Sequence, residues 1–206
     1  MIESSSVTTK CALHLAAPVL ATILMLLSGC AGKDGSLHGS PYPSPTPAPA
    51  LALSDTEGAT FNLTSLSGHS VLVYFGYTQC QDECPLTLAN ASWVIEQLGA
   101  SGDQVEFILV TVDPANDTPA VLRAYLDKFN PRFIGLTGTE EQLALARSAY
   151  GVPAATPEAG LEHADVLHGT RLYLIGPDGR LLTSYDLSIP QGTILDDLRS
   201  LLEAAG

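Results

Sequence analysis

Lys and Arg are scarce in this sequence: they total 9, against 22 Asp and Glu, and the formal net charge is −13. Few basic residues argue against nucleic acid as a partner, because phosphate binding needs a basic face. An excess of acidic residues suits a cation or a basic partner surface, and it would equally serve to keep a protein soluble. The charge balance therefore excludes one class of partner without identifying another.

Cysteine is also scarce, with four residues in a chain of 206. Cys11 and Cys30 belong to an N-terminal apolar segment, which leaves Cys80 and Cys84 in the rest of the chain. Two cysteines in a chain of this size do not form a disulfide scaffold. The apolar share of 46% is normal for a protein with a packed core. A domain of roughly 150 residues can bury a self-sufficient core, so no metal is needed for folding alone.

The N-terminal segment is predicted to be a targeting signal. The run CALHLAAPVLATILMLLSG at 11–29 has signal-peptide length and is short of a comfortable membrane span. It ends in Leu-Ser-Gly-Cys at 27–30, which resembles a bacterial lipobox with Cys30 as the lipidated residue. Residues 1–30 are therefore predicted to be a lipoprotein-type signal peptide. An uncleaved N-terminal membrane helix is the alternative, and both interpretations tether the remaining chain outside the cytoplasm.

Residues 31–50 are predicted to be a Pro-rich linker. Proline alternates through the second half of this segment, in the sequence PYPSPTPAPA at 41–50. Alternating proline favours polyproline II, which forms a semi-rigid spacer. Such a spacer would hold a domain off the membrane, and His38 is assigned no role in it.

A single α/β domain is predicted for residues 51–206. Near-continuous apolar runs indicate buried strands, whereas apolar residues at helical spacing indicate helices between them. The predicted strands are 71–77, 105–112, 132–136, 171–175 and 180–185, with a short strand or hairpin at 59–66; the predicted helices are 85–98, 119–129, 139–150 and 193–205. This order suggests a thioredoxin-like three-layer fold with a central mixed sheet.

The chemistry of the domain is predicted to lie at Cys80 and Cys84, between a buried strand and a helix. Their Cys-x-x-x-Cys spacing puts both side chains on one face of a helical turn, about 5–6 Å apart at Cβ. That geometry allows the two thiolates to share a metal ion or to form a disulfide. Soft sulfur selects Cu(I), and an added imidazole also suits Cu(II) or zinc. His163 and His168 are the candidate imidazoles, so a Cys2His2 zinc site is conceivable, but an open three-ligand site better fits copper that must be released.

The sequence around these cysteines resembles the Sco/SenC family of copper chaperones. The resemblance begins with YFGYTQCQDECP at 74–85 and continues through TVDP at 111–114 and DTP at 117–119. It extends through FNPRFIGLTG at 129–138 to YLIGPDG at 173–179. The resemblance implies a thioredoxin fold, copper as Cu(I) or Cu(II), and a role in assembling the CuA site of cytochrome c oxidase.

The resemblance also implies specific residues and partners. His168 matches by position the histidine that joins Cys80 and Cys84 as copper ligands. Asp82 and Asp113 match acidic positions near the copper site, although an exposed helix-entry residue and a turn residue are the respective alternatives. The expected partners are the oxidase subunit that carries CuA, an upstream copper donor or thiol reductant, and the membrane through a lipid anchor at Cys30.

Two enzymatic interpretations compete with a copper chaperone, which is a binding protein without turnover. A thiol–disulfide oxidoreductase would reduce the cysteines of the oxidase copper site with Cys80 and Cys84 as its redox pair. The three-residue gap and His168 argue against it, but the two roles are compatible. A peroxiredoxin-like peroxidase lacks its Pro-x-x-x-Thr-x-x-Cys arrangement, because Tyr74 precedes Thr78 by four residues and Cys80 follows it by two.

Overall fold

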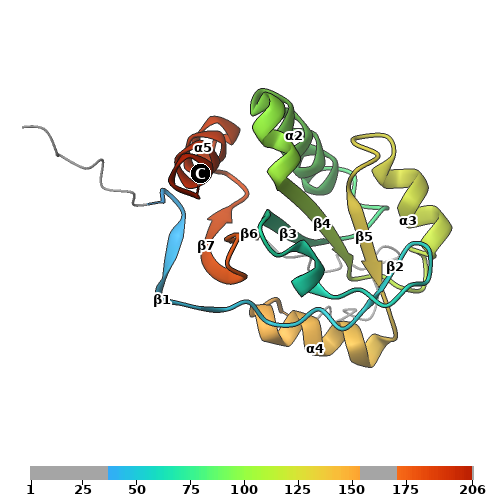
Figure 1. Ribbon diagram of the computed structural model, residues 1–206. Coiled ribbons are helices and arrows are strands. Elements are labelled where there is room, and N and C mark those ends of the chain that lie inside the picture. Colours follow the sequence, from blue (N-terminus) through green and yellow to red (C-terminus); the bar gives the residue numbers. More distant parts are fainter. Residues whose placement is uncertain (1–36, 154–170, 206) are drawn as a thin grey trace, which may run out of the picture. The chain divides into compact units, whose positions relative to one another are not determined.

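The computed structural model describes residues 37–153 and 171–205, which contain a seven-stranded mixed sheet (Figure 1). The strands lie in the order β1-β7-β6-β3-β4-β5-β2. Their bounds are β1 Ser40–Pro47, β2 Ser54–Asp55, β3 Ser70–Gly76, β4 Val105–Thr111, β5 Ile134–Thr137, β6 Arg171–Ile175 and β7 Arg180–Asp186. Strands β3, β4 and β5 are parallel, and the other pairings are antiparallel. The predicted α/β fold with a central mixed sheet is confirmed.

Strands β3 and β4 form the centre of the sheet and are buried on both faces. Successive side chains of a strand point to opposite faces, so a strand between two helical layers needs apolar residues throughout. In β3, Leu72 and Tyr74 pack into one core cluster, and Val73 and Phe75 pack into the other. The near-continuous apolar run read from the sequence thus reflects two cores on either side of one strand.

The helices cover these two faces unequally. Apolar residues of α2 (Glu83–Gln97), α3 (Pro119–Leu126) and α5 (Gln191–Ala205) pack in the core cluster that contains Tyr74. Residues of α4 (Glu140–Tyr150) pack in the cluster that contains Phe75. Figure 1 shows α2 and α5 on the side of the sheet opposite α4. The sheet and the two helical layers make the predicted three-layer architecture.

Helix α4 forms as its sequence predicts. The Thr139 side chain accepts a hydrogen bond from the Gln142 backbone N–H, and the Gln142 side chain accepts one from the Thr139 backbone N–H. This reciprocal capping satisfies amide groups that otherwise lack partners in the first turn of a helix. Gly151 closes the helix with a left-handed φ of 69°, which glycine adopts without steric cost.

The proline-rich segment does not behave throughout as the predicted linker. Its residues Ser40–Pro47 form β1, which pairs antiparallel with β7 at the edge of the sheet. Proline is tolerated in an edge strand because one side of such a strand needs no amide donors. His38 also contacts the domain: its ring Nδ1 lies 2.5 Å from Asp197 Oδ1 on α5. The folded region therefore begins before residue 51, where the domain was predicted to start.

Two smaller differences lie near the ends of β3. Within the predicted short strand or hairpin at 59–66, residues 59–61 pair antiparallel with 53–55 through a bridge between Ser54 and Thr60. Leu63–Leu66 is instead a 3-10 helix, η2, whose first turn is capped by the Asn62 side chain. Helix α2 begins at Glu83, two residues before the predicted start at Pro85, so Cys84 lies inside its first turn. Among the residues described, no helix combines the length and apolarity needed to cross a membrane. Cys30, His163 and His168 lie outside the described ranges.

Candidate metal centre

Cys80 and Cys84 lie where the central strand β3 leads into helix α2. Strand β3 ends at Gly76, Cys80 follows in the connecting loop, and Cys84 is the second residue of α2. The parallel neighbour β4 ends beside β3, with Thr111 in register with Gly76. The loop that follows β4 therefore lies at the same end of the sheet as the cysteines.

The two thiols are free and differ in exposure. Cys84 is 0% exposed, whereas Cys80 is half-buried. The backbone N–H of Cys84 donates a hydrogen bond to the sulfur of Cys80 over 3.4 Å. The start of α2 thus holds the sulfur of Cys80 against the backbone of Cys84, which agrees with the proximity expected from the i, i+4 spacing.

Burial raises the pKa of the Cys84 thiol to about 12. Hydrogen bonds from the Tyr74 side chain and the Tyr77 backbone oppose this rise, and Cys80 adds to it. The Tyr74 hydroxyl lies 3.5 Å from the Cys84 sulfur, and burial followed by the charge of Cys84 raises the pKa of Tyr74 well above its usual range. At neutral pH without metal, Cys84 is a protonated thiol, so a metal that binds it must displace a proton.

Gly76 makes room for the buried sulfur. A Cβ atom added at this glycine would lie 2.7 Å from Tyr74 Cε1 and 3.0 Å from the Cys84 sulfur. The first distance forces a neighbouring atom to shift and the second is tight, so close packing favours glycine at this position. The Gly at the end of the YFGY motif therefore has a direct connection to the cysteine pair.

The two predicted acidic neighbours have different environments. Asp82 is exposed at the N-cap of α2, and its side chain makes no capping hydrogen bond. Asp113 is half-buried in the loop after β4, where its carboxylate accepts a hydrogen bond from the Asn116 side chain over 2.8 Å. In the described part of the chain, no three His, Cys, Asp or Glu side chains gather as a metal site. The described part of the site thus consists of two sulfur donors.

Asp117 is a residue of this region to which the sequence interpretation gave no role. It is fully buried after β4, and its carboxylate accepts hydrogen bonds from the backbone and hydroxyl of Thr78, two residues before Cys80. It lies in the DTP segment that carried part of the family resemblance. This motif was the available sequence signal, but Asp between a strand and a helix is most commonly a turn residue.

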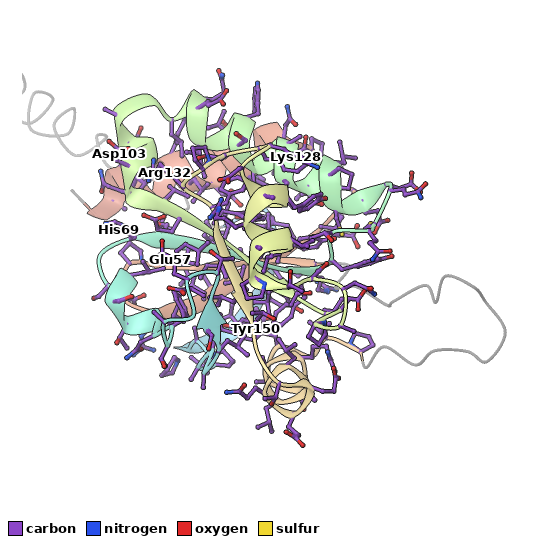
Figure 2. All side chains as sticks on the ribbon, turned by 90° about the vertical axis from the view of Figure 1, so that its right-hand side faces the viewer. Glu57, His69, Asp103, Lys128, Arg132 and Tyr150 are labelled. Atoms are coloured by element: carbon purple, nitrogen blue, oxygen red, sulfur yellow. The ribbon has the colours of Figure 1, made fainter. Side chains whose placement is uncertain are left out.

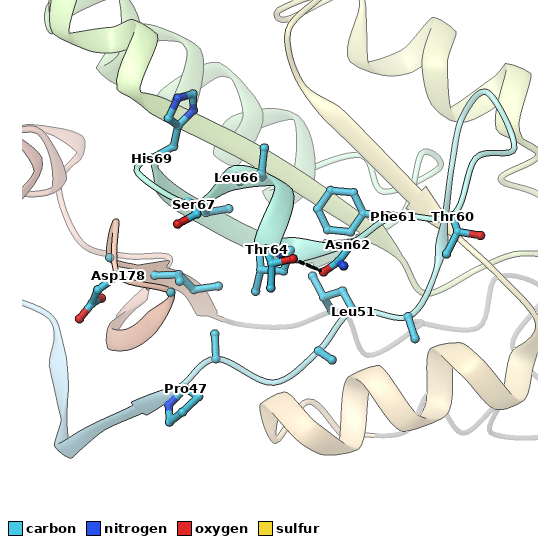
Figure 3. Close-up of a pocket in the computed structure, with 18 residues that line it drawn as sticks. Pro47, Leu51, Thr60, Phe61, Asn62, Thr64, Leu66, Ser67, His69 and Asp178 are labelled. Atoms are coloured by element: carbon cyan, nitrogen blue, oxygen red, sulfur yellow. Dashed lines mark hydrogen bonds between the residues drawn. The ribbon is translucent and has the colours of Figure 1, made fainter.

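A cavity of about 530 Å³ lies at the other end of the sheet (Figure 3). Its walls come from residues 47–52, from η2 and the residues before it, and from the β6–β7 turn, with His69 beside the start of β3. No cysteine lines it. The cavity is therefore separate from the cysteine pair, which follows the opposite end of β3.

His69, which lines this cavity, also belongs to an ion-pair network, and Figure 2 labels it together with Asp103 and Arg132. Arg132 pairs with Asp103 at 3.0 Å and with Glu106 at 3.7 Å. His69 Nδ1 lies 3.2 Å from Glu106. These groups lie near the start of β3 and β4, so this network is separate from the cysteine pair.

Comparison with known proteins identifies the family. The family model described as SCO1/SenC matches residues 44–203. A relative from Stutzerimonas stutzeri is 39% identical over 132 residues, which make up 64% of this chain and 65% of that relative, slightly less than two thirds of its length.

Two solved structures are also similar. The copper-bound structure of Bradyrhizobium japonicum ScoI has a TM-score of 0.65 at 31% identity, covering 81% of this chain and 99% of that one. The BsSco structure, in which a disulfide switch was identified, has a TM-score of 0.63 at 26% identity. The match covers 79% of this chain and 96% of BsSco. It is described as a member of the Sco family of cytochrome c oxidase assembly proteins. With its thioredoxin-like fold and its match over most of its length, this chain belongs to the SCO1/SenC family.

Proposed function

We propose that this protein binds copper through Cys80, Cys84 and His168 and delivers it to the CuA-bearing subunit of cytochrome c oxidase. The observation that carries the proposal is the pair of free thiols one helical turn apart, with one sulfur accessible and the other buried. The copper-bound ScoI structure and the oxidase-assembly family of BsSco support it.

The donor set suits copper as a cargo. Two thiolates favour soft Cu(I), and an imidazole extends the range to Cu(II). Three protein ligands leave room for a ligand from a partner, so the metal can pass by stepwise ligand exchange. The half-buried Cys80 is accessible to that partner, whereas the buried Cys84 would be the last sulfur to release the copper.

The assignment of His168 rests on its position in the family motif and gains support from the sheet. His168 precedes β6 by three residues, and β6 pairs antiparallel with β3 so that Leu172 is in register with Tyr74. The first residues of β6 thus lie toward the cysteine end of β3. In our proposal Asp82 and Asp113, at the same end, are the acidic neighbours of the bound cation.

The proposed site of action is the outer side of a membrane. Cys30 would carry a lipid anchor, and the residues between it and β1 would form the remaining tether. An upstream copper donor or a thiol reductant would load the site there. Reduction is required because thiols in an oxidising compartment tend to form disulfides.

The test is a copper titration of the full chain in detergent after reduction under nitrogen. We expect one tightly held copper per chain and thiolate-to-copper charge-transfer bands with Cu(II). His168→Ala should weaken binding and change the bands, whereas His163→Ala, five residues earlier, should leave both unchanged. A wild-type protein that retains no copper would refute the proposal.

Thiol–disulfide exchange is the second candidate function. It is favoured by the exposure difference between Cys80 and Cys84, because an accessible sulfur could attack a partner disulfide and a buried neighbour could resolve the product. The same preparation separates the two functions. Rapid reduction of an oxidised CuA-site peptide by a chain that holds no copper would favour the oxidoreductase.

A further inference from the structure

A buried carboxylate lies beside the cysteine loop without a cationic partner in the described part of the chain. Asp117 is 0% exposed, and no basic side chain of that part forms an ion pair with it. Burying a charge costs free energy unless hydrogen bonds replace the lost water. The hydrogen-bond donors that compensate the burial of Asp117 therefore show which segments of the chain its carboxylate holds together.

Within residues 37–153 and 171–205, all of the donors to Asp117 are neutral, and they come from the ends of two neighbouring strands. The hydroxyl of Thr78 donates over 2.5 Å, and the backbone N–H of Thr78 over 3.1 Å. The hydroxyl of Thr111, the last residue of β4, donates over 2.6 Å. One carboxylate thus joins the loop that follows β3 to the end of β4.

This junction lies close to the proposed ligands in sequence and in space. Thr78 lies between the end of β3 and Cys80. Thr111 is in register with Gly76, where an added Cβ would meet Tyr74 and the Cys84 sulfur. Thr78 lies beyond Gly76, the last residue of β3, and its backbone N–H donates to the Asp117 carboxylate rather than to a neighbouring strand. Without Asp117, the start of the Cys80 loop would lose both a backbone and a side-chain attachment.

We propose that Asp117 is a positioning residue of the metal site, whose buried carboxylate holds the loop that carries Cys80 against the end of β4. This inference rests on the proposed function, since it assigns Asp117 an effect on copper binding. Burial raises the pKa of Asp117 and the hydrogen bonds from Thr111 and Thr78 oppose that rise, which agrees with a carboxylate held by these donors. Asp117 acts through Thr78 and does not itself contact the metal.

The test compares matched variants of the full chain. Thr78→Val removes the hydroxyl at nearly constant volume, Thr78→Ser retains it, and Asp117→Asn keeps the shape of the side chain. We expect Asp117→Asn and Thr78→Val to weaken Cu(I) binding by about tenfold, measured by competition with a chromophoric chelator, and Thr78→Ser to restore it. The double variant that combines Thr78→Val with Asp117→Asn should bind copper no more weakly than the single variant with the lower affinity. Both substitutions break the same hydrogen bond between the Thr78 hydroxyl and the Asp117 carboxylate, so their effects should not add.

Tyr185→Phe is the control for a purely structural effect. It removes another hydroxyl that donates to a buried carboxylate, that of Asp197 over 2.9 Å, on a strand two positions from β3. We expect this control to lower the unfolding temperature without changing copper affinity. If Thr78→Val and Asp117→Asn also lower only the unfolding temperature, the positioning role is refuted.

A second readout separates this inference from the proposed function. The rate at which iodoacetamide alkylates Cys80 reports the loop geometry without copper. If the wild-type chain binds no copper, the proposed function fails by itself. Altered alkylation in Thr78→Val and Asp117→Asn, but not in Tyr185→Phe, would still establish that Asp117 positions the loop, and unchanged alkylation would refute it.

Discussion

Cys84 and Cys80 have the same side chain but different surroundings. The buried sulfur of Cys84 contacts the Tyr74 hydroxyl and lies under Gly76, while Cys80 reaches the surface of the loop. Desolvation disfavours a thiolate at Cys84 until a cation is present to balance its charge. At the residue scale, metal binding at the proposed ligand Cys84 would therefore be coupled to its deprotonation.

This coupling predicts that copper affinity depends on pH. The pKa of Cys84 is raised to about 12, so at pH 7–9 this thiol holds a proton that copper would have to displace if Cys84 is a ligand as proposed. For this proton alone, the apparent Cu(I) association constant should rise about tenfold per pH unit. We expect that rise between pH 7 and 9, where an ordinary imidazole is already neutral. Affinity that stays constant over this range would show that Cys84 is not a ligand or not protonated.

Tyr74→Phe tests the hydroxyl beside the buried sulfur. The hydrogen bond from Tyr74 lowers the pKa of Cys84, so its loss should favour the protonated thiol further and weaken copper binding. The net value of one hydrogen bond is roughly 0.5–1.5 kcal/mol, which corresponds to a change in affinity of about two- to tenfold. Tyr173→Phe is a suitable control, because its hydroxyl donates to the Tyr150 carbonyl in the core on the other face. Equal copper affinity in the two variants would contradict the role of Tyr74.

Sequence reasoning at this scale identified the cysteine pair but not its surroundings. Cys-x-x-x-Cys between a buried strand and a helix can be read directly from residue types and spacing. The contacts of Gly76, Tyr74 and Asp117 depend on how β3, β4 and α2 pack, which spacing alone does not determine. The family motifs contained all three residues without indicating what each one touches.

At the scale of elements, the close approach of β3 and α2 depends on Gly76. Gly76→Ala should lower the free energy of unfolding by about 1–3 kcal/mol, because its Cβ would overlap Tyr74 and crowd the Cys84 sulfur. Gly192→Ala is the control, since no atom lies within 4 Å of its added Cβ and alanine favours a helix. Chemical denaturation measures both variants. Equal stability of Gly76→Ala and the wild type would show that the junction adjusts without cost.

Helices and strands were predicted well where a local sequence pattern, such as a capping box or a continuous apolar run, was enough to determine them. Thr139 and Gln142 form the expected capping box, and the buried runs that became β3 and β4 have nearly the predicted bounds. The Pro-rich segment was misread because proline alternation suits both a free spacer and an edge strand. Only the pairing of β1 with β7 decides between them, and such long-range pairing cannot be read from local composition.

At the scale of the whole molecule, the contact between His38 and Asp197 fastens the segment before β1 to α5. Asp197 is 2% exposed and also accepts a hydrogen bond from Tyr185, whereas the His38 side chain is 63% exposed. The hydrogen bond and charge of Asp197 raise the pKa of His38 above 6.5, with a small addition from Asp196. The contact holds the residues directly before β1 against α5 more strongly when His38 is protonated.

The sign of the resulting pH dependence follows from this raised pKa. Stability from protonated His38 is fully present below its unfolded pKa of 6.5 and is lost as pH rises through the higher folded value. His38→Ala should therefore lower the unfolding temperature more at pH 5.5 than at pH 8.5. In an Asp197→Asn background, His38→Ala should change the unfolding temperature equally at pH 5.5 and pH 8.5. If His38→Ala lowers the unfolding temperature equally at both pH values in the otherwise wild-type chain, the prediction is wrong.

We propose that Cys80, Cys84 and His168 bind copper together. X-ray absorption spectroscopy of the copper-loaded full chain tests it most directly, because it identifies the atoms bonded to the metal. We expect two sulfur donors and an imidazole nitrogen, with loss of one sulfur in Cys84→Ser and loss of the imidazole signal in His168→Ala. A copper shell without sulfur, or an unchanged shell in both variants, would refute the proposed ligand set.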